Sequence, residues 1–153
     1  PTTTASATRA ADSAVIDGAE FSAFYRPASG TVVWRGALSA VNDGTVWSIG
    51  DGTANEVIRL QVVTGNLRAQ VVDGGTTVAD IDLGSVTADT AYSVALAYAE
   101  NDIAACLDGG TVGTDAAATL PAVDRLEIGG GVHGRPLYWP ARLPDATLQS
   151  LTE

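Results

Sequence analysis

The sequence is poor in several residue types, and each shortage excludes a class of protein. A single cysteine, Cys106, and a single histidine, His133, leave no intrachain disulfide and too few side chains for a zinc site of the Cys/His type. All cations are arginine, and the formal net charge of −10 repels nucleic acid and anionic membranes. No apolar run approaches the length that spans a bilayer. We therefore expect neither nucleic acid binding nor membrane insertion.

The chain is rich instead in glycine, with 17 residues placed between short segments of alternating polar and apolar side chains. Such alternation predicts strands joined by tight turns. The predicted strands lie within residues 30–38, 45–52, 55–75, 91–110, 124–131 and 135–143. No helical period is sustained until residues 144–153, which predict one closing helical turn. We interpret residues 1–11 as a Thr/Ala-rich tail or linker stub, and residues 12–153 as one all-β domain, a two-sheet antiparallel sandwich or jelly roll.

Residues 55–75 predict a hairpin in which Gly65 and Asn66 form the loop. With Thr64 opposite Leu67, one face is entirely apolar and the other is polar. The apolar face contains Ile58, Leu60, Val62, Leu67, Ala69 and Val71, and the polar face contains Arg59, Gln61, Arg68 and Gln70. In this register Gln61 lies opposite Gln70, and Arg35 has the same outward phase on its own strand. Trp34 and Trp47 have the inward phase, which predicts core positions.

The polar face supports two interpretations. It is an ordinary solvated sheet surface, or a groove whose guanidinium and amide groups suit the hydroxyls and carboxylates of a polysaccharide, an acidic one included. Residues 91–110 predict a second hairpin, with its loop at Glu100 and Asn101 and a reverse face of small residues, which would be the floor of the groove or a flat seat for another chain.

Adjacent Tyr138 and Trp139 lie on opposite faces of their strand, so one points outward and could stack on a sugar or cover the sheet edge.

Several pieces of the sequence, in their order and spacing, resemble the concanavalin A-like (laminin-G-like) jelly-roll domains in structural proteins of tailed bacteriophages and prophages. The pieces are TRAAD, GTVVW, SIGDGTANEVIRL, ALAYAENDIAACLDGG, TDAAATLP, RLEIGG and YWPARLPDATLQSLT, which together cover almost all of the chain after its Thr-rich start. The resemblance implies the jelly-roll fold, a virion location, and attachment to cell-surface glycans. One departure is Pro144, where related sequences carry a serine helix cap.

Jelly rolls of this class include glycosidases, which need paired carboxylates. The spacing Glu-x-Asp-x-x-Glu is absent, and Asp80 with Asp82 is interpreted as a strand end. No Gly-x-Ser-x-Gly elbow accompanies His133, so we expect no catalytic residues and no enzyme. We also expect no cofactor, although loop-bound calcium stays open, because residues 42–44, 50–56 and 100–102 supply oxygen ligands. Those same residues are what tight turns require, and we favour that interpretation.

The primary expectation is a non-catalytic carbohydrate-binding domain of a phage or phage-like particle that attaches to host cell-surface polysaccharide. Its candidate carbohydrate-binding residues are Arg35, Arg59, Gln61, Arg68, Gln70 and Tyr138. The alternative is a structural virion module, such as a fibre tip, spike or decoration protein, that works through self-association or through capsid and tail contacts. Both place the chain on the virion, with a host glycan, other virion proteins or further copies of itself as partners.

Overall fold

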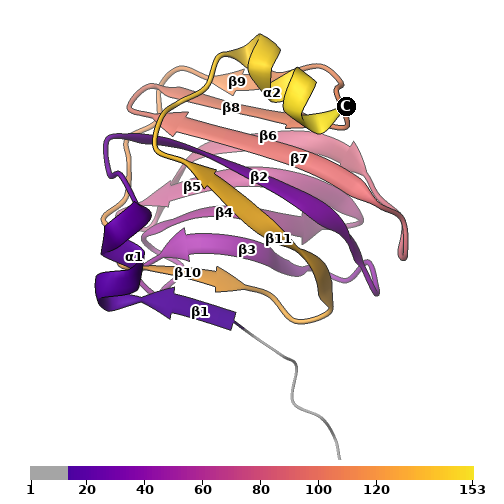
Figure 1. Ribbon diagram of the computed structural model, residues 1–153, viewed down its shortest axis with the longest axis horizontal. Coiled ribbons are helices and arrows are strands. Elements are labelled where there is room, and N and C mark those ends of the chain that lie inside the picture. The colour runs from indigo at the N-terminus through magenta and orange to yellow at the C-terminus, as the bar shows by residue number, and fades with distance from the viewer. Residues whose placement is uncertain (1–13) are drawn as a thin grey trace, which may run out of the picture.

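Residues 14–153, the part of the chain that the computed structural model describes, form two antiparallel sheets stacked face to face (Figure 1). The six-stranded sheet has the order β1 (Ala14–Asp17), β10 (Arg125–Ile128), β3 (Gly44–Gly50), β4 (Val57–Val63), β5 (Asn66–Asp73) and β6 (Thr76–Ser85). The five-stranded sheet has the order β11 (Val132–Trp139), β2 (Ser29–Leu38), β7 (Tyr92–Ala99), β8 (Asp102–Leu107) and β9 (Gly113–Asp115). This confirms the predicted two-sheet jelly roll. The expected boundary between a tail of residues 1–11 and a domain of residues 12–153 lies outside the described residues.

Two helices accompany the sheets. The C-terminal helix α2 (Asp145–Thr152) follows Pro144 as predicted, but it has eight residues and so makes two turns instead of one. The short helix α1 (Gly18–Phe24) was not predicted, because seven residues with a single buried side chain, Phe21, carry no readable helical period. No helix within residues 14–153 has the length and hydropathy needed to cross a membrane.

The alternation along β4 and β5 sorts side chains between the core and the surface as the sequence predicts. Ile58 and Leu60 are fully buried between the sheets, and Val62 is 3% exposed. Trp34 and Trp47 are also buried in this core, at 0% and 1% exposed. Burial of such side chains is the main favourable contribution to the stability of the sandwich.

The first hairpin bends one residue earlier than predicted. Val62 pairs with Leu67 and Leu60 with Ala69, so the two loop residues are Thr64 and Gly65. Both have positive φ, 48° and 84°, as a type I′ turn requires. The backbone N–H of Thr64 donates to the Asp43 carboxylate at 2.7 Å, a contact from the preceding loop that supports this bend.

This shift keeps every side chain on its predicted face but changes the cross-strand partners. Gln70 now lies opposite Arg59, and Gln61 lies opposite Arg68, so the predicted Gln61–Gln70 pair was wrong. The second hairpin has its predicted register, with Tyr98 opposite Ile103 and Leu96 opposite Ala105.

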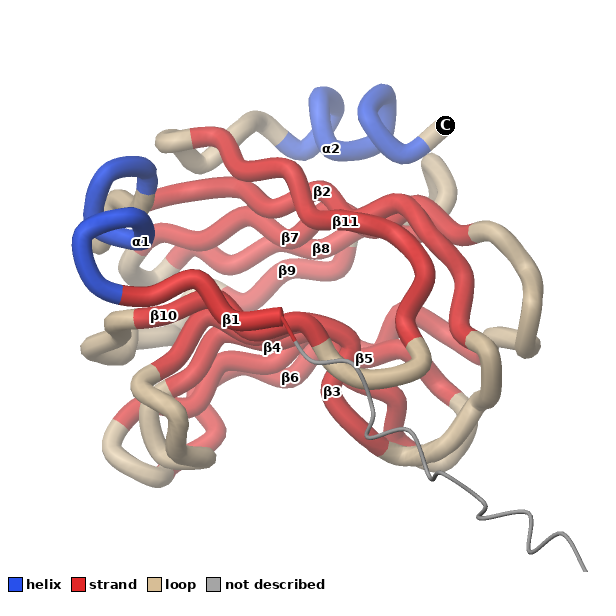
Figure 2. Tube along the Cα trace, turned by 60° about the horizontal axis from the view of Figure 1, so that its bottom comes forward, coloured by secondary structure: helices blue, strands red, loops and turns tan. Residues whose placement is uncertain are grey.

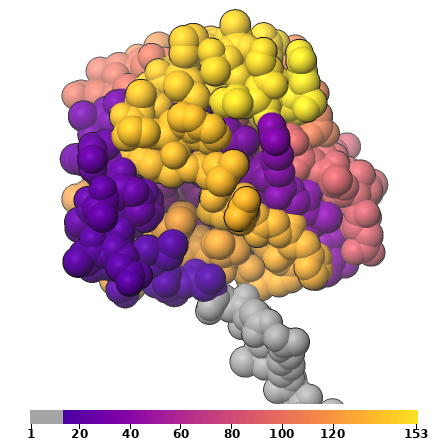
Figure 3. Space-filling view, in the orientation of Figure 1, coloured from indigo at the N-terminus to yellow at the C-terminus, as the bar shows by residue number. Residues whose placement is uncertain are grey.

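The small-residue face of the second hairpin is covered by the chain itself. Leu148 of α2 is fully buried against Val33, Ala95, Ala97, Ala104 and Cys106. Figure 3 shows α2 and the segment before it (yellow) as a cap on one end of the molecule. This face is therefore neither the floor of a groove nor a seat for another chain, because small side chains let the helix approach closely and fill that space. Cys106 is buried beneath the cap.

Candidate functional site

Four of the predicted site residues come together on the outer face of the six-stranded sheet, with their side chains turned away from the core. Arg59 donates from Nε to Gln70 Oε1 at 2.9 Å, and its Nη2 donates to the same oxygen. Gln61 lies between Thr45 of β3 and Arg68 of β5 and is only 9% exposed. Hydrogen bonds therefore hold Arg59 and Gln70 together, and Gln61 is enclosed by its neighbours.

Two aspartates of β6 complete this network on one side. Arg68 Nε donates to Asp80 Oδ1 at 2.9 Å. Asp82 accepts hydrogen bonds from the Asn66 side chain and from the backbone N–H of Gly84, and these hydrogen bonds lower the pKa of its carboxyl. Both aspartates lie within β6, so their interpretation as a strand end was wrong.

Arg59 is electrostatically distinct from its neighbours. Its guanidinium is half-buried, and this burial lowers the pKa of Arg59, with the charge of Asp80 partly opposing the effect. Arg68 and Arg125 each form an ion pair with an aspartate, whereas no carboxylate of residues 14–153 lies within ion-pair distance of Arg59. Its charge is therefore available to an anionic or hydroxylated ligand.

A hollow of about 150 Å³ opens beside Arg59 on the same face. It is lined by β3, β4 and β10, which contribute Ser48, Arg59, Arg125 and Glu127 among other residues. In the sequence Arg125 and Glu127 alternate with the apolar Leu126 and Ile128, and this alternation indicates that Arg125 and Glu127 face outward. What the sequence does not show is that β10 pairs with β3, a strand more than seventy residues earlier. We call this hollow and the surrounding Arg59, Gln61, Arg68 and Gln70 the outer-face site.

Arg35 does not belong to the outer-face site. It has the predicted outward phase, but on β2 of the other sheet, where its Nη2 donates to the carbonyl oxygen of Leu151 at 2.6 Å. A cation at this place stabilises the C-terminal end of α2. Strand phase identifies which side of a strand a residue occupies, and it does not identify the sheet to which the strand belongs.

Tyr138 is also separated from the outer-face site. It pairs with Val32 and has the inward phase, whereas Trp139 has the outward phase and packs with the cluster under α2. The Tyr138 hydroxyl accepts from the backbone N–H of Arg26 at 2.8 Å and contacts the Tyr98 hydroxyl at 2.8 Å. Tyr98 in turn donates to the Arg26 carbonyl oxygen, so Tyr138 is part of a closed hydrogen-bond ring.

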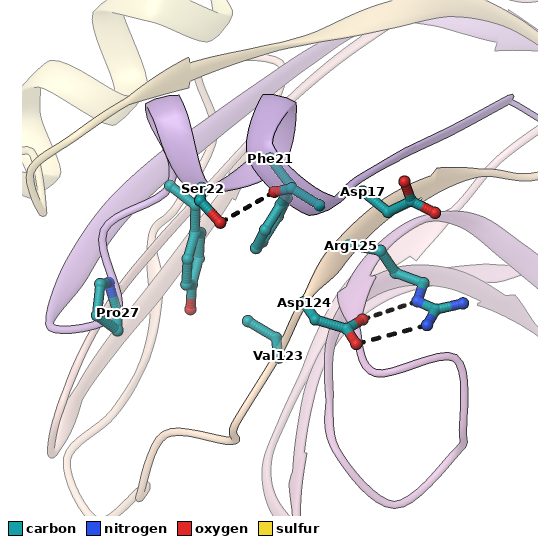
Figure 4. A pocket seen from close by; sticks show the side chains of 9 residues that line it. Asp17, Phe21, Ser22, Pro27, Val123, Asp124 and Arg125 are labelled. Atoms are coloured by element: carbon teal, nitrogen blue, oxygen red, sulfur yellow. Dashed lines mark hydrogen bonds and ion pairs between the residues drawn. The ribbon is translucent and has the colours of Figure 1, made fainter.

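A larger hollow, which the sequence did not indicate, lies between α1 and the segment that leads into β10 (Figure 4). Its volume is about 570 Å³. Its lining residues are Asp17, Gly18, Phe21, Ser22, Tyr25, Pro27, Val123, Asp124 and Arg125. The rings of Phe21 and Tyr25 stack with centroids 4.7 Å apart. We call it the α1 hollow.

Arg125 lines both hollows. Its Nε donates to Asp124 Oδ1 at 2.8 Å, and this hydrogen bond raises the pKa of Arg125. The guanidinium also lies against Gly52, whose φ of 86° favours glycine. The α1 hollow and the outer-face site are consequently neighbours that share one side chain.

The buried hydroxyl of Tyr25 makes stability depend on alkaline pH. Burial raises the pKa of Tyr25 to about 12, and within residues 14–153 its hydroxyl has no hydrogen-bond partner. An unfolded chain ionises its tyrosines near pH 10, whereas the folded protein keeps Tyr25 neutral, so the free energy of unfolding falls as the pH rises from 10 to about 12. Tyr25→Phe should reduce this fall and should not lower stability at neutral pH. Urea unfolding of both proteins across this pH range checks it, and equal pH dependence would contradict the assignment.

Two of the three loops considered for calcium use a carboxylate to support turns, and the third uses Asp102 in an ion pair with Arg142. Asp51 Oδ1 accepts hydrogen bonds from the backbone N–H of Thr53 at 2.8 Å and from its hydroxyl at 2.7 Å. The Asp43 carboxylate holds the hairpin bend at Thr64. In the described part of the chain, no three His, Cys, Asp or Glu side chains gather where they could hold a metal ion. The expectation of no cofactor, with loop-bound calcium left open, stays a prediction.

Neither a protein-family model nor a curated protein matches this sequence. Solved structures do match. The CBM40 domain of the Ruminococcus gnavus IT-sialidase, bound to α2,3 sialyllactose, is 17% identical with a TM-score of 0.68, over 82% of this chain and 83% of that one. The binding domain of botulinum neurotoxin DC in complex with SialylT is 10% identical with a TM-score of 0.67, over 91% of this chain and 38% of that one. Mouse laminin α1 domains LG4-5 are 13% identical with a TM-score of 0.56, over 77% of this chain and 37% of that one. The chain therefore has the concanavalin A-like jelly-roll fold.

Proposed function

We propose that this chain is a non-catalytic carbohydrate-binding domain and that polysaccharide binds at the outer-face site. The observation that carries the proposal is the half-buried Arg59, which makes no carboxylate contact within residues 14–153 and lies beside a hollow lined by Ser48 and Glu127. Guanidinium groups donate to sugar hydroxyls and carboxylates, and serine and glutamate oxygens accept from sugar hydroxyls. Because the network fixes these side chains, little conformational entropy is lost on binding.

Two of the structural neighbours support a carbohydrate ligand by analogy of fold. The Ruminococcus gnavus domain was solved with sialyllactose, and the botulinum neurotoxin domain was solved with SialylT. Because one fold serves many functions, this analogy adds to the chemistry of the outer-face site and does not replace it.

The setting that we propose is the surface of a phage or phage-like particle, where the domain would attach to host cell-surface polysaccharide. The support is the resemblance of the sequence pieces, from GTVVW to YWPARLPDATLQSLT, to jelly-roll domains of phage structural proteins. Binding without hydrolysis agrees with the missing Glu-x-Asp-x-x-Glu spacing. Incubation with oligosaccharides followed by product analysis would reveal a hydrolase and contradict this part of the proposal.

Substitution of the two arginines tests the site. Hydrogen bonds to charged groups contribute about 1.5–3 kcal/mol each, so Arg59→Ala with Arg68→Ala should weaken binding to isolated host polysaccharide by roughly tenfold or more. The matched control is Arg135→Ala, an exposed arginine on β11 of the other sheet, which should leave the affinity unchanged. Unchanged affinity in the double variant would show that the site is wrongly assigned.

A structural virion module is the second candidate, and one observation favours it. The exposed large apolar side chains of residues 14–153 are Val15 (49%), Ile16 (36%) and Leu137 (42%), which lie on the edge strands β1 and β11. Both strands border the same open side of the sandwich (Figure 2). Size-exclusion chromatography with light scattering separates the candidates: a stable trimer or larger ring favours assembly, and a monomer contradicts it.

A further inference from the structure

The α1 hollow has the construction of a binding site for a small ligand. Its volume of about 570 Å³ lies within the range of ligand pockets, roughly 300–1,000 Å³. One part of its wall is apolar, with Phe21, Tyr25, Pro27 and Val123. Figure 4 shows Pro27 on one side of the hollow and the charged Asp17 and Arg125 on the other. A ligand that fits must therefore offer an apolar face and a polar edge.

The polar edge supplies acceptors of hydrogen bonds and one positive charge. The Asp17 carboxylate takes part in no hydrogen bond or ion pair among residues 14–153, so it can accept from a hydroxyl. Ser22 donates its hydroxyl hydrogen to the Gly18 carbonyl at 2.9 Å and keeps its lone pairs. Arg125 uses Nε and Nη2 on Asp124, and its Nη1 lies against Gly52, so what it adds to this edge is its positive charge. Neighbouring hydroxyls on a sugar ring match this combination, and the C–H face of the ring matches the apolar wall.

Charge then limits the class of sugar. Asp17 and Asp124 face the hollow with only one guanidinium, that of Arg125, so the local formal charge is −1 and a carboxylated or sulfated sugar is repelled. The outer-face site favours an acidic sugar instead, because no carboxylate of the described residues contacts the positively charged Arg59. The two places are neighbours through Arg125.

We propose that the α1 hollow binds one neutral sugar residue of the polysaccharide that the outer-face site holds, so that the complete site spans at least two different sugars. This inference rests on the proposed carbohydrate-binding function, and it adds a subsite of defined chemistry at the end of the sandwich near α1.

Single sugars test the α1 hollow independently of the polysaccharide. Neutral glucose, galactose, mannose and N-acetylglucosamine, with glucuronic acid as the acidic counterpart, would be titrated into ¹⁵N-labelled protein. We expect saturable shifts of the Ser22, Asp124 and Arg125 amides with at least one neutral sugar and none with glucuronic acid. Absence of shifts with every neutral sugar, or equal shifts with glucuronic acid, would overturn the inference.

Two tryptophan substitutions provide a matched pair. Ser22 lines the hollow, whereas Ala23 beside it does not, and both are exposed on α1, so neither change disturbs the core. Ser22→Trp should abolish the single-sugar shifts and weaken polysaccharide binding about tenfold, and Ala23→Trp should change neither. If wild type and Ser22→Trp bind polysaccharide equally well, the subsite is wrong while the proposed function stands. If the wild type binds no polysaccharide, the proposed function itself is wrong.

Discussion

Leu148→Ala should lower the free energy of unfolding by about 2–5 kcal/mol, the range for truncating a fully buried leucine. Leu148 is 0% exposed and is the one side chain of α2 at the centre of the cluster with Val33, Ala95, Ala97 and Cys106. The alanines beneath it are too short to fill the space that truncation leaves, so the cavity term persists. Urea unfolding followed by tryptophan fluorescence measures the loss.

Leu151→Ala is the matched control for this prediction. Leu151 belongs to the same helix and packs against the same cluster, but it is only half-buried. Its truncation removes less buried apolar area and should cost clearly less stability. If the two variants lose equal stability, then α2 does not seal the small-residue face through Leu148, and its contribution must come from elsewhere along the helix.

Gly36→Ala should destabilise the protein by about 3 kcal/mol or more, at the upper end of what overpacking a filled interior costs. A Cβ at this position would lie 1.9 Å from the carbonyl oxygen of His133 and 2.8 Å from the Trp34 ring. Because the closest atom belongs to the backbone of β11, no side-chain rotation relieves the clash. The strands β2 and β11 would have to separate, and Gly36 lies where β11 pairs with β2 through Gly134.

Gly44→Ala makes a suitable comparison, since Gly44 also lies in a strand and a Cβ there would meet no atom within 4 Å. Neither glycine has a positive φ, so the two substitutions differ in available space and not in backbone strain. We expect Gly44→Ala to change stability by about 0.5 kcal/mol or less. Thermal unfolding of both variants measures the difference, and a stable Gly36→Ala would disprove the close approach of β11.

Strand phase was readable from the sequence because it is a local property. Ile58 and Leu60 alternate with Arg59 and Gln61. An arrangement that buries only the apolar residues of each strand is more stable than one that buries polar and apolar residues together. The register of the first hairpin was not readable, since Gly65 fits a bend at 64–65 as well as one at 65–66. Asp43, from a separate loop, contacts the bend that forms.

The candidate site was only partly readable for the same reason. Arg59 and Arg68 belong to one hairpin, so their proximity follows from the sequence itself. Arg35 has the same outward phase, yet it lies on the opposite sheet and contacts α2. The α1 hollow joins residues 17–27 to residues 123–125, and no sequence pattern relates segments so far apart.

By itself the sequence determined the all-β class, the second hairpin, the closing helix and the polar side of β4 and β5, because each depends on alternation or turn chemistry within about twenty residues. Only the tertiary structure decided which strands are neighbours, for example that β10 pairs with β3. It also decided that α2 covers the alanines and that the two hollows form. The physical reason is that sheet order follows from how two whole apolar faces bury each other, which is a property of the complete chain and of no single segment.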